Sequence, residues 1–227
     1  MSHPLPLSVA PSRPPRRGAA RRIGLFGGSF DPVHRGHLHA ARAALAVFDL
    51  DRVVFVPAAE SPHKVGRRMA GGAHRLAMLE LAIAGEPRFG TSDLELARGG
   101  RSYTIDTVRA LPARLGEDRD CRLYLIVGSD NVALLPTWRE ALALLERVQP
   151  IVVHRDGEPD RLLEAAARAL PPELAAKLRA GYLRLPPFIA SSTDLRARLA
   201  GGHEDPDTMP DAVSTYARTH GLYGAST

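Results

Sequence analysis

The sequence has little cysteine, few aromatic side chains and no long apolar run. Cys121 is the only cysteine among 227 residues, which excludes a disulfide scaffold and a zinc site built from cysteines. No apolar run approaches the roughly 20 residues of a membrane span, so the sequence excludes a membrane protein. A lone cysteine also fits a reducing compartment, and we expect a cytoplasmic protein. With 44% apolar and 24% charged residues, the composition is that of an ordinary globular domain.

Lysine is scarce as well, and the basic excess is confined to one end of the chain. The formal net charge is +5, but residues 1–22 hold five arginines and no acid, so the remainder is net neutral. The same stretch holds five prolines and lacks the apolar core of a secretory signal. We therefore predict a disordered tail over residues 1–21, a single domain over residues 22–227 and no nucleic-acid partner. The sequence predicts no particular oligomeric state.

Apolar runs and helical spacing alternate along the rest of the chain. Strands are predicted at residues 23–26, 53–57, 88–96, 123–128, 151–153 and 182–185. Helices are predicted at residues 31–48 (or from about 36), 72–84, 104–115, 137–148, 160–180 with a break at 171–172, 192–200 and 210–219. This alternation predicts an α/β fold with a doubly wound, mostly parallel sheet and helices on both faces. Ligands of such sheets bind at the carboxyl ends of the strands, here after Phe26, Val56, Val127 and Leu185.

Local capping patterns predict where three of these helices begin. Asp31 is the candidate N-cap of the first helix, with Pro32 at its first position. Thr104 is the candidate cap of the helix over residues 104–115. Thr137 and Glu140 have the spacing of a capping box.

The most informative string, GGSFDPVHRGH, follows the first strand at residues 27–37. Gly27 and Gly28 allow a phosphate to approach the backbone, and the helix start that follows offers N–H groups. The string is neither a dinucleotide fingerprint nor a P-loop. His34 and His37 would share one face of a helix and could donate hydrogen bonds to phosphate oxygens. The alternative is a pair of capping or core histidines, and zinc lacks a third ligand at a suitable spacing.

Further candidates stand at later strand ends and helix starts, each with a structural alternative. Lys64 follows the second strand, where it could reach phosphates or be a solvated loop residue. Residues 102–107 could offer backbone N–H groups to a carboxylate or simply begin a helix. Trp138, the only tryptophan, could be a plate for a pyridine ring or a core residue.

Two more candidate groups lie at a strand end and at a helix start. Asp130 comes after the strand over residues 123–128 and could also cap a helix. Near the C-terminus, four residues could bind phosphates at a helix start or could form an ordinary N-cap. They are Ser191, Ser192, Thr193 and Arg196.

The string at residues 27–37 resembles the G-x-F-D-P-x-H-x-G-H signature of the nucleotidyltransferase superfamily. Taken in order with the strings below, the chain resembles the bacterial nicotinate-nucleotide adenylyltransferases over about residues 22–223. The further strings are PHK at 62–64, SYTIDT at 102–107, GSD at 128–130 with Trp138, SST at 191–193 with Arg196, and LY at 222–223. The chain departs from the family at Ser61, often proline, and at Ser129, often alanine, and neither change removes a functional group.

The resemblance implies a Rossmann-like nucleotidyltransferase fold and adenylyl transfer from ATP to nicotinate mononucleotide, giving deamido-NAD and pyrophosphate. It implies catalytic roles for His34, His37, Lys64 and Arg196. The ATP site would comprise Gly27, Gly28, Ser29, Phe30, His34, His37, Ser191, Ser192, Thr193 and Arg196. The acceptor site would comprise Lys64, Tyr103, Thr104, Asp130, Trp138 and Arg155. Mg²⁺ would accompany ATP, held by phosphates and water rather than by a protein metal site.

Other functions stay open at this point. The same phosphate chemistry could serve nicotinamide mononucleotide or phosphopantetheine as the acceptor. A catalytically silent nucleotide-binding module is the alternative from a different class, although such a copy would be free to lose His34, His37, Lys64 and Arg196.

Overall fold

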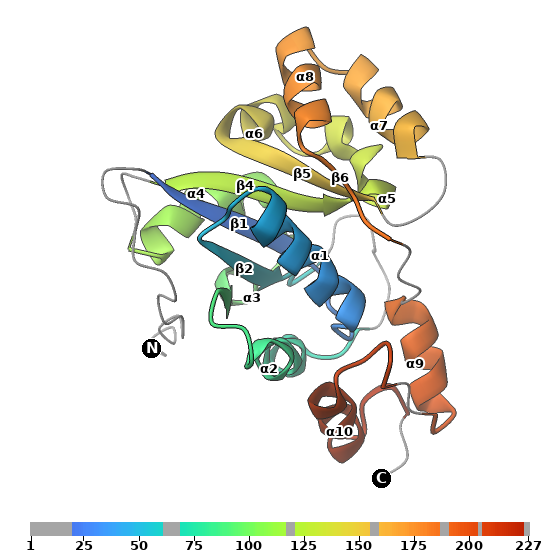
Figure 1. Cartoon of the computed structure of the whole chain (residues 1–227). Helices are drawn as coiled ribbons and strands as arrows, with labels where there is room; N and C mark the ends of the chain where they lie inside the picture. Colours follow the sequence, from blue (N-terminus) through green and yellow to red (C-terminus); the bar gives the residue numbers. More distant parts are fainter. Residues whose placement is uncertain are drawn as a thin grey trace.

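A computed structural model describes residues 20–60, 69–116, 121–154, 159–186, 191–203 and 206–224 (Figure 1). Within these ranges six strands form one sheet in the order β3-β2-β1-β4-β5-β6, and every pairing is parallel. The strands are β1 (Arg21–Gly28), β2 (Arg52–Pro57), β3 (Phe89–Thr91), β4 (Cys121–Gly128), β5 (Val148–His154) and β6 (Tyr182–Arg184). The predicted doubly wound sheet is confirmed.

Helices connect successive strands and cover both faces of the sheet. The longer ones are α1 (Arg35–Val47), α2 (Gly72–Ile83), α4 (Thr104–Arg114), α7 (Pro159–Arg168), α8 (Pro172–Ala180), α9 (Ser192–Ala200) and α10 (Asp211–Thr219). The shorter ones are α3 (Leu94–Arg98), α5 (Ser129–Val132), α6 (Ala141–Arg147) and the 3₁₀ turns η1 (Leu135–Thr137) and η2 (Leu222–Gly224). In the ranges that the structure describes, none of them has the length and apolar character needed to cross a membrane.

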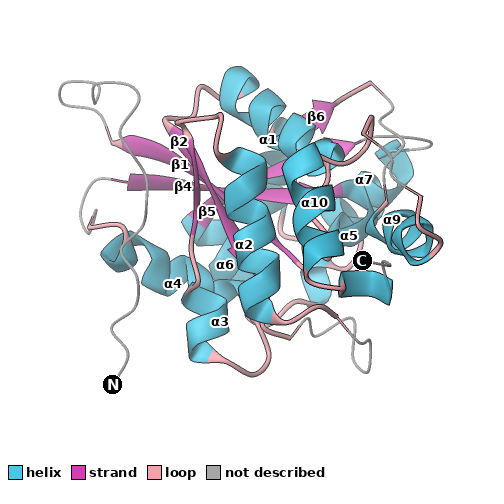
Figure 2. Cartoon of the chain, turned by 90° about the horizontal axis from the view of Figure 1, so that it is seen from below, coloured by secondary structure: helices cyan, strands magenta, loops and turns pink. Residues whose placement is uncertain are grey.

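Two hydrophobic cores lie on opposite faces of the sheet because strand side chains alternate between the faces. Tyr124 and Ile126 of β4 belong to the core that α1, α2, α9 and α10 cover. Leu123 and Leu125 of the same strand belong to the core under α4 to α8. Figure 2 shows α2 and α10 side by side over the first of these cores. A strand that is buried on both faces reads as a continuous apolar run, which explains why β4 stands out so clearly in the sequence.

The strand order reverses between β1 and β4, the two central neighbours. These strands pair from Arg21 with Cys121 to Phe26 with Ile126. Chain segments that leave adjacent strands toward different sides open a crevice at the carboxyl ends. The fold therefore places the string that follows β1 at this crevice.

The strand predicted at residues 88–96 is wrong for most of its length. Pairing with β2 covers Phe89–Thr91 only, and the chain then forms α3. The N–H of Ala97 donates to the carbonyl of Asp93 at 2.8 Å, which is a helical bond. Apolar residues of a short helix and of an edge strand are spaced alike over so few residues, so periodicity could not separate them.

Two predicted helix caps are displaced by a few residues. Helix α1 begins at Arg35 with His34 as its N-cap, so Asp31 is not the cap and the later start near residue 36 is closer. Tyr103, rather than Thr104, occupies the N-cap position of α4.

The capping box predicted at Thr137 and Glu140 is wrong. Thr137 ends the η1 turn, and Glu140 precedes α6 with a left-handed φ of 52°. The Glu140 carboxylate binds the guanidinium of Arg109 through contacts of 2.5 and 3.1 Å. Glu140 therefore forms an ion pair with Arg109 on α4 instead of the predicted capping contact.

Helix α6 offers a matched test of the second core. Leu144 is fully buried, whereas Leu142 on the same helix is 49% exposed. We expect Leu144→Ala to lower the free energy of unfolding by about 2–5 kcal/mol, because it removes buried methyl groups and leaves a cavity. Leu142→Ala should change it by less than about 0.5 kcal/mol. Urea unfolding followed by circular dichroism measures both, and equal effects would contradict the assignment of this core.

Candidate active site

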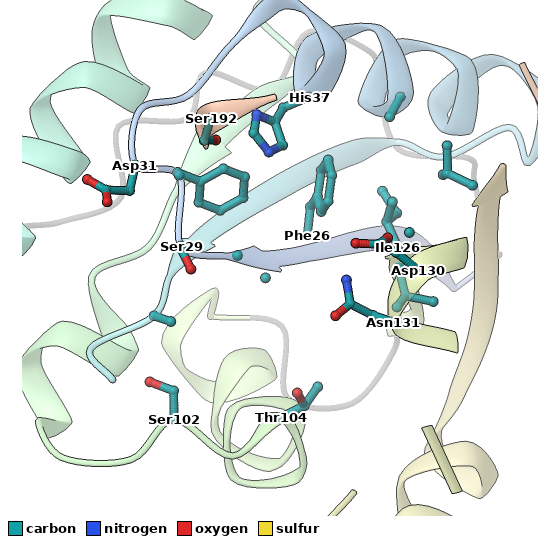
Figure 3. A pocket seen from close by; sticks show the side chains of 18 of the residues that line it. Phe26, Ser29, Asp31, His37, Ser102, Thr104, Ile126, Asp130, Asn131 and Ser192 are labelled. Carbon is teal, nitrogen blue, oxygen red and sulfur yellow. The ribbon is translucent and has the colours of Figure 1, made fainter. Parts of the chain in front are cut away.

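A cavity of about 440 Å³ opens at the carboxyl ends of β1 and β4 (Figure 3). Every predicted site residue that the structure describes lines it. These residues are Gly27, Gly28, Ser29, Phe30, His34, His37, Tyr103, Thr104, Asp130, Trp138, Ser191, Ser192, Thr193 and Arg196. Lys64 and Arg155 lie outside the described residues.

His34 and His37 come together at the start of α1, although His34 precedes the helix with an extended backbone. Their rings stack with centroids 3.7 Å apart. The backbone N–H of His34 donates to Nδ1 of His37 at 3.2 Å. Because Nδ1 accepts this bond, the proton of the neutral His37 ring sits on Nε2, from which it can be donated to a ligand oxygen.

Packing against Phe30 sets the position of His37. Phe30 is 2% exposed, and its ring meets the His37 ring edge to face, with centroids 5.0 Å apart. A Cβ on Gly28 would lie 3.0 Å from the Phe30 ring, so any other residue there would push against this buried ring. A Cβ on Gly27 would meet nothing within 4 Å. The backbone at Gly27 therefore faces open cavity.

The start of α9 lies beside the two histidines. Ser191 is its N-cap, which is the structural alternative that the sequence left open, and its hydroxyl accepts two backbone N–H bonds of 3.2 Å from the first turn. The Ser192 hydroxyl donates to the carbonyl of Pro32 at 3.0 Å. Figure 3 shows Ser192 and His37 on the same side of the cavity. This end of the cavity therefore contains a helix start, hydroxyl groups and two imidazoles.

Arg196 is tethered at the edge of the same end. Its Nη1 donates to the backbone carbonyl of Asp31 at 2.6 Å and lies 3.7 Å from the Asp31 carboxylate. Its Nη2 donates to the Thr193 hydroxyl at 3.1 Å. The guanidinium is therefore held in place before any ligand arrives.

The carboxylate of Asp31 is buried behind the cavity and is only 2% exposed. Its Oδ1 accepts bonds from the backbone N–H of Ala70 at 3.0 Å and from the Tyr223 hydroxyl at 2.8 Å. Arg75, also 2% exposed, donates to the carbonyls of Ser29 and Ala70 at 2.8 and 2.9 Å. In Figure 3 the Asp31 side chain points away from His37. Through these contacts the Asp31 carboxylate holds neighbouring segments together at the edge of the cavity.

Burial and charge act together on this network. Burial raises the pKa of the Tyr223 hydroxyl far above its ordinary value, and the Asp31 carboxylate raises it further. Burial lowers the pKa of the Arg75 guanidinium, and Asp31 opposes this effect by favouring the charged form. Tyr223 therefore stays protonated as a donor at any physiological pH.

The opposite side of the cavity is built from the start of α4 and the turn before α6 (Figure 3). The Ser102 hydroxyl accepts a 2.9 Å bond from the N–H of Ala59, which fixes this segment to the end of β2. The first N–H groups of a helix have no intrahelical acceptor, so those of α4 near Thr104 are available to a ligand. Trp138 packs on the second core and also lines the cavity.

Sequence reasoning missed several residues of this site. Asn131 and Arg139 line the cavity beside the predicted Asp130 and Trp138, and adjacency to those residues was the only available signal. Asp31 was assigned to a helix cap. No sequence pattern identifies Arg75, because its burial and its hydrogen bonds depend on the segments that pack around it in the folded chain.

Comparison with known proteins places the chain in one family. Residues 25–198 match the cytidylyltransferase-like family. The chain is similar to a protein of Bordetella petrii, 44% identical over 208 residues, which covers 89% of this chain and 99% of that protein. A protein of Symbiobacterium thermophilum is 43% identical over 204 residues, covering 89% and 95%. Both carry the name "Probable nicotinate-nucleotide adenylyltransferase".

Solved structures support the fold. Plasmodium falciparum nicotinic acid mononucleotide adenylyltransferase complexed with NaAD aligns with a TM-score of 0.68 and 17% identity, covering 91% of this chain and 98% of that one. Its complex with APC aligns with a TM-score of 0.67. At this identity the likeness concerns the fold alone.

The Tyr223 hydroxyl offers a test of the network around Asp31. We expect Tyr223→Phe to lower the free energy of unfolding by about 1.5–3 kcal/mol, because the hydrogen bond to a buried charged group is lost. Tyr216→Phe is the matched control, since its hydroxyl meets the half-buried His74 at 3.1 Å and should cost about 1 kcal/mol or less. Chemical denaturation compares the two, and a Tyr223→Phe protein as stable as the wild type would contradict this role.

Proposed function

The chain belongs to the cytidylyltransferase-like family and, within it, to the nicotinate-nucleotide adenylyltransferases, and we propose how its residues divide the reaction between them. The reaction transfers the adenylyl group of ATP to nicotinate mononucleotide and yields deamido-NAD and pyrophosphate, a step of NAD biosynthesis. The observation that carries the proposal is one cavity with two stacked histidines at one end and Trp138 beside a helix start at the other.

The chemistry is an in-line displacement at phosphorus. An oxygen of the acceptor phosphate forms a bond to the α-phosphorus of ATP, and the bond from that phosphorus to the bridging oxygen breaks. Pyrophosphate leaves with the electron pair. The acceptor phosphate is already an anion at neutral pH, so no general base is required. Catalysis then consists of positioning and of stabilising charge that develops on oxygen.

His37 and His34 bind the phosphates of ATP in this proposal. The bond from the His34 N–H to Nδ1 of His37 keeps Nε2 of His37 as a donor. A donor that is fixed in advance needs no reorganisation as charge builds up, which is the main source of electrostatic catalysis. The exposed backbone at Gly27 leaves room for a phosphate next to the rings.

The start of α9 completes the ATP end. Ser192 and Thr193 present hydroxyl groups, and the helix start contributes a positive dipole. Arg196 lies within reach through its tether to Asp31 and Thr193. We propose that these groups bind the triphosphate and the departing pyrophosphate.

The nicotinate ring of the acceptor stacks on Trp138, and its carboxylate meets the N–H groups near Tyr103 and Thr104. The supporting observation is that Trp138 lines the cavity while the second core supports its other side. Asp130, which lies in α5 directly after β4, holds a ribose hydroxyl in this proposal. Lys64 and Arg155 remain candidates for contacts with the phosphates.

Mg²⁺ enters the proposal as part of the substrate, bound to ATP. Across the residues that the structure describes, no three His, Cys, Asp or Glu side chains are grouped so that they could hold a metal ion. Those residues therefore do not fit a resident metal, whereas phosphate oxygens and water are good Mg²⁺ ligands.

The direct test is pyrophosphate release from ATP and Mg²⁺ with three acceptors: nicotinate mononucleotide, nicotinamide mononucleotide and phosphopantetheine. We expect clear preference for nicotinate mononucleotide. Preference for another acceptor would be consistent with the proposed phosphate chemistry but would contradict the proposed contacts to the acceptor. No release with any of them would favour a silent nucleotide-binding module.

Replacing His37 tests the ATP end. We expect His37→Ala to lower kcat by about 100-fold or more, the usual scale for losing one preorganised donor. His39→Ala on the same helix is the matched control, because His39 does not line the cavity and its loss should leave kcat within about twofold. Steady-state kinetics at saturating ATP measure both, and near-normal turnover of His37→Ala would refute the role.

Replacing Trp138 tests the acceptor end. We expect Trp138→Ala to raise the KM for nicotinate mononucleotide by about tenfold with a smaller effect on kcat, because stacking contributes to binding on the scale of 1–2 kcal/mol. Trp138→Phe, which keeps a ring, should recover most of the affinity. An unchanged KM in the alanine variant would show that Trp138 has only a structural role.

A further inference from the structure

Two guanidinium groups belong to the described lining of the cavity, one at each end. Arg196 lies at the end that holds the histidines, and Arg139 lies at the end that holds Trp138. The role of Arg196 follows from its tether to Asp31 and Thr193. Nothing in the adenylyl transfer itself requires a second guanidinium so far from the ATP end.

The Arg139 side chain is held over the start of α4. Its guanidinium carbon lies 4.8 Å from the centre of the Tyr103 ring, a cation–π contact. Its Nη1 lies 3.7 Å from the carboxylate of Asp106 in the first turn of the helix. These two contacts place a positive charge over the Tyr103 ring and near the first turn of α4.

Among the described residues that line the cavity, Arg139 is the basic residue at this end. Glu140, the next residue, is engaged by Arg109 at 2.5 Å. Glu95, which also lines the cavity, is buried and accepts a 2.6 Å bond from the Thr107 hydroxyl. Asp106 pairs with Arg139 over 3.7 Å, longer than a strong ionic hydrogen bond. The guanidinium carries five N–H donors, so this single contact does not exhaust it.

We propose that the Arg139 side chain determines the preference for a pyridine carboxylate over a pyridine carboxamide. The inference rests on the proposed function, since it assumes that the pyridine ring stacks on Trp138. Nicotinate and nicotinamide mononucleotides carry the same phosphate and ribose and differ by one negative charge on the ring substituent. A cation beside the ring recognises that difference directly, whereas backbone N–H groups can bind a carboxylate or the carbonyl oxygen of an amide.

The size of the effect follows from exposure. The Arg139 side chain is 52% exposed, so water screens its charge until a ligand covers it. A partly desolvated, hydrogen-bonded ion pair is stronger than a surface pair. We expect the acid-to-amide affinity ratio to fall about five- to tenfold when the charge is removed.

The experiment is a binding titration that needs no turnover. Trp138 is the only tryptophan, so quenching of its fluorescence reports a ligand on that ring. Kd values for nicotinate and nicotinamide mononucleotides are measured with the wild type, Arg139→Gln and Arg139→Lys. Arg179→Gln is the control, because this guanidinium pairs with Glu164 on a distant helix and does not line the cavity.

The inference predicts weaker binding of the acid to Arg139→Gln, unchanged binding of the amide, and largely restored selectivity in Arg139→Lys. An unchanged ratio in Arg139→Gln would overturn it. Equal weakening of both ligands would also overturn it, because the contact would then be to the shared phosphate or purely structural. Binding with the predicted selectivity but no pyrophosphate release would instead reject the proposed function and keep the inference about binding.

Discussion

The buried carboxylate of Asp31 is the interaction on which the arrangement of the site depends. A charged group that is 2% exposed persists only if other contacts replace its lost hydration. Ala70 and Tyr223 bind one of its oxygens, and Arg196 lies 3.7 Å from the other. These partners come from three separate segments. Satisfying one buried charge therefore holds α9, the segment before α2 and the C-terminal turn against the loop that follows β1.

The geometry of the two histidines follows from the same loop. Phe30 enters the core with a left-handed backbone, φ 47°, and its ring fixes His37 from one side. The His34 ring stacks on His37, and the His34 N–H directs the His37 proton to Nε2. The Nε2 donor of His37 is thus oriented by hydrophobic packing and one backbone bond. This is the kind of preorganisation that electrostatic catalysis requires.

The topology of the sheet separates the two ends of the cavity. The loop after β1 and the start of α9 form the end that carries His37 and Arg196, while the start of α4 and the turn before α6 form the end that carries Trp138 and Arg139. Both ends meet where the strand order reverses between β1 and β4. Because different segments supply the two ends, residues at the end that carries Trp138 can change without disturbing the end that carries His37.

The sequence by itself determined the α/β class, the order of the elements and a little under half of the residues that line the cavity. It could do so because buried parallel strands need apolar residues on both faces and because a phosphate loop needs glycines close to a helix start. Three features were decided only by the tertiary structure. The Asp31 carboxylate is buried and does not cap a helix, Glu140 forms an ion pair with Arg109, and Arg139 lines the cavity. In each case the side chain contacts residues that are distant in the sequence and that only folding brings near. Asp31 and Tyr223 are 192 positions apart, and no local pattern records a partner at that distance.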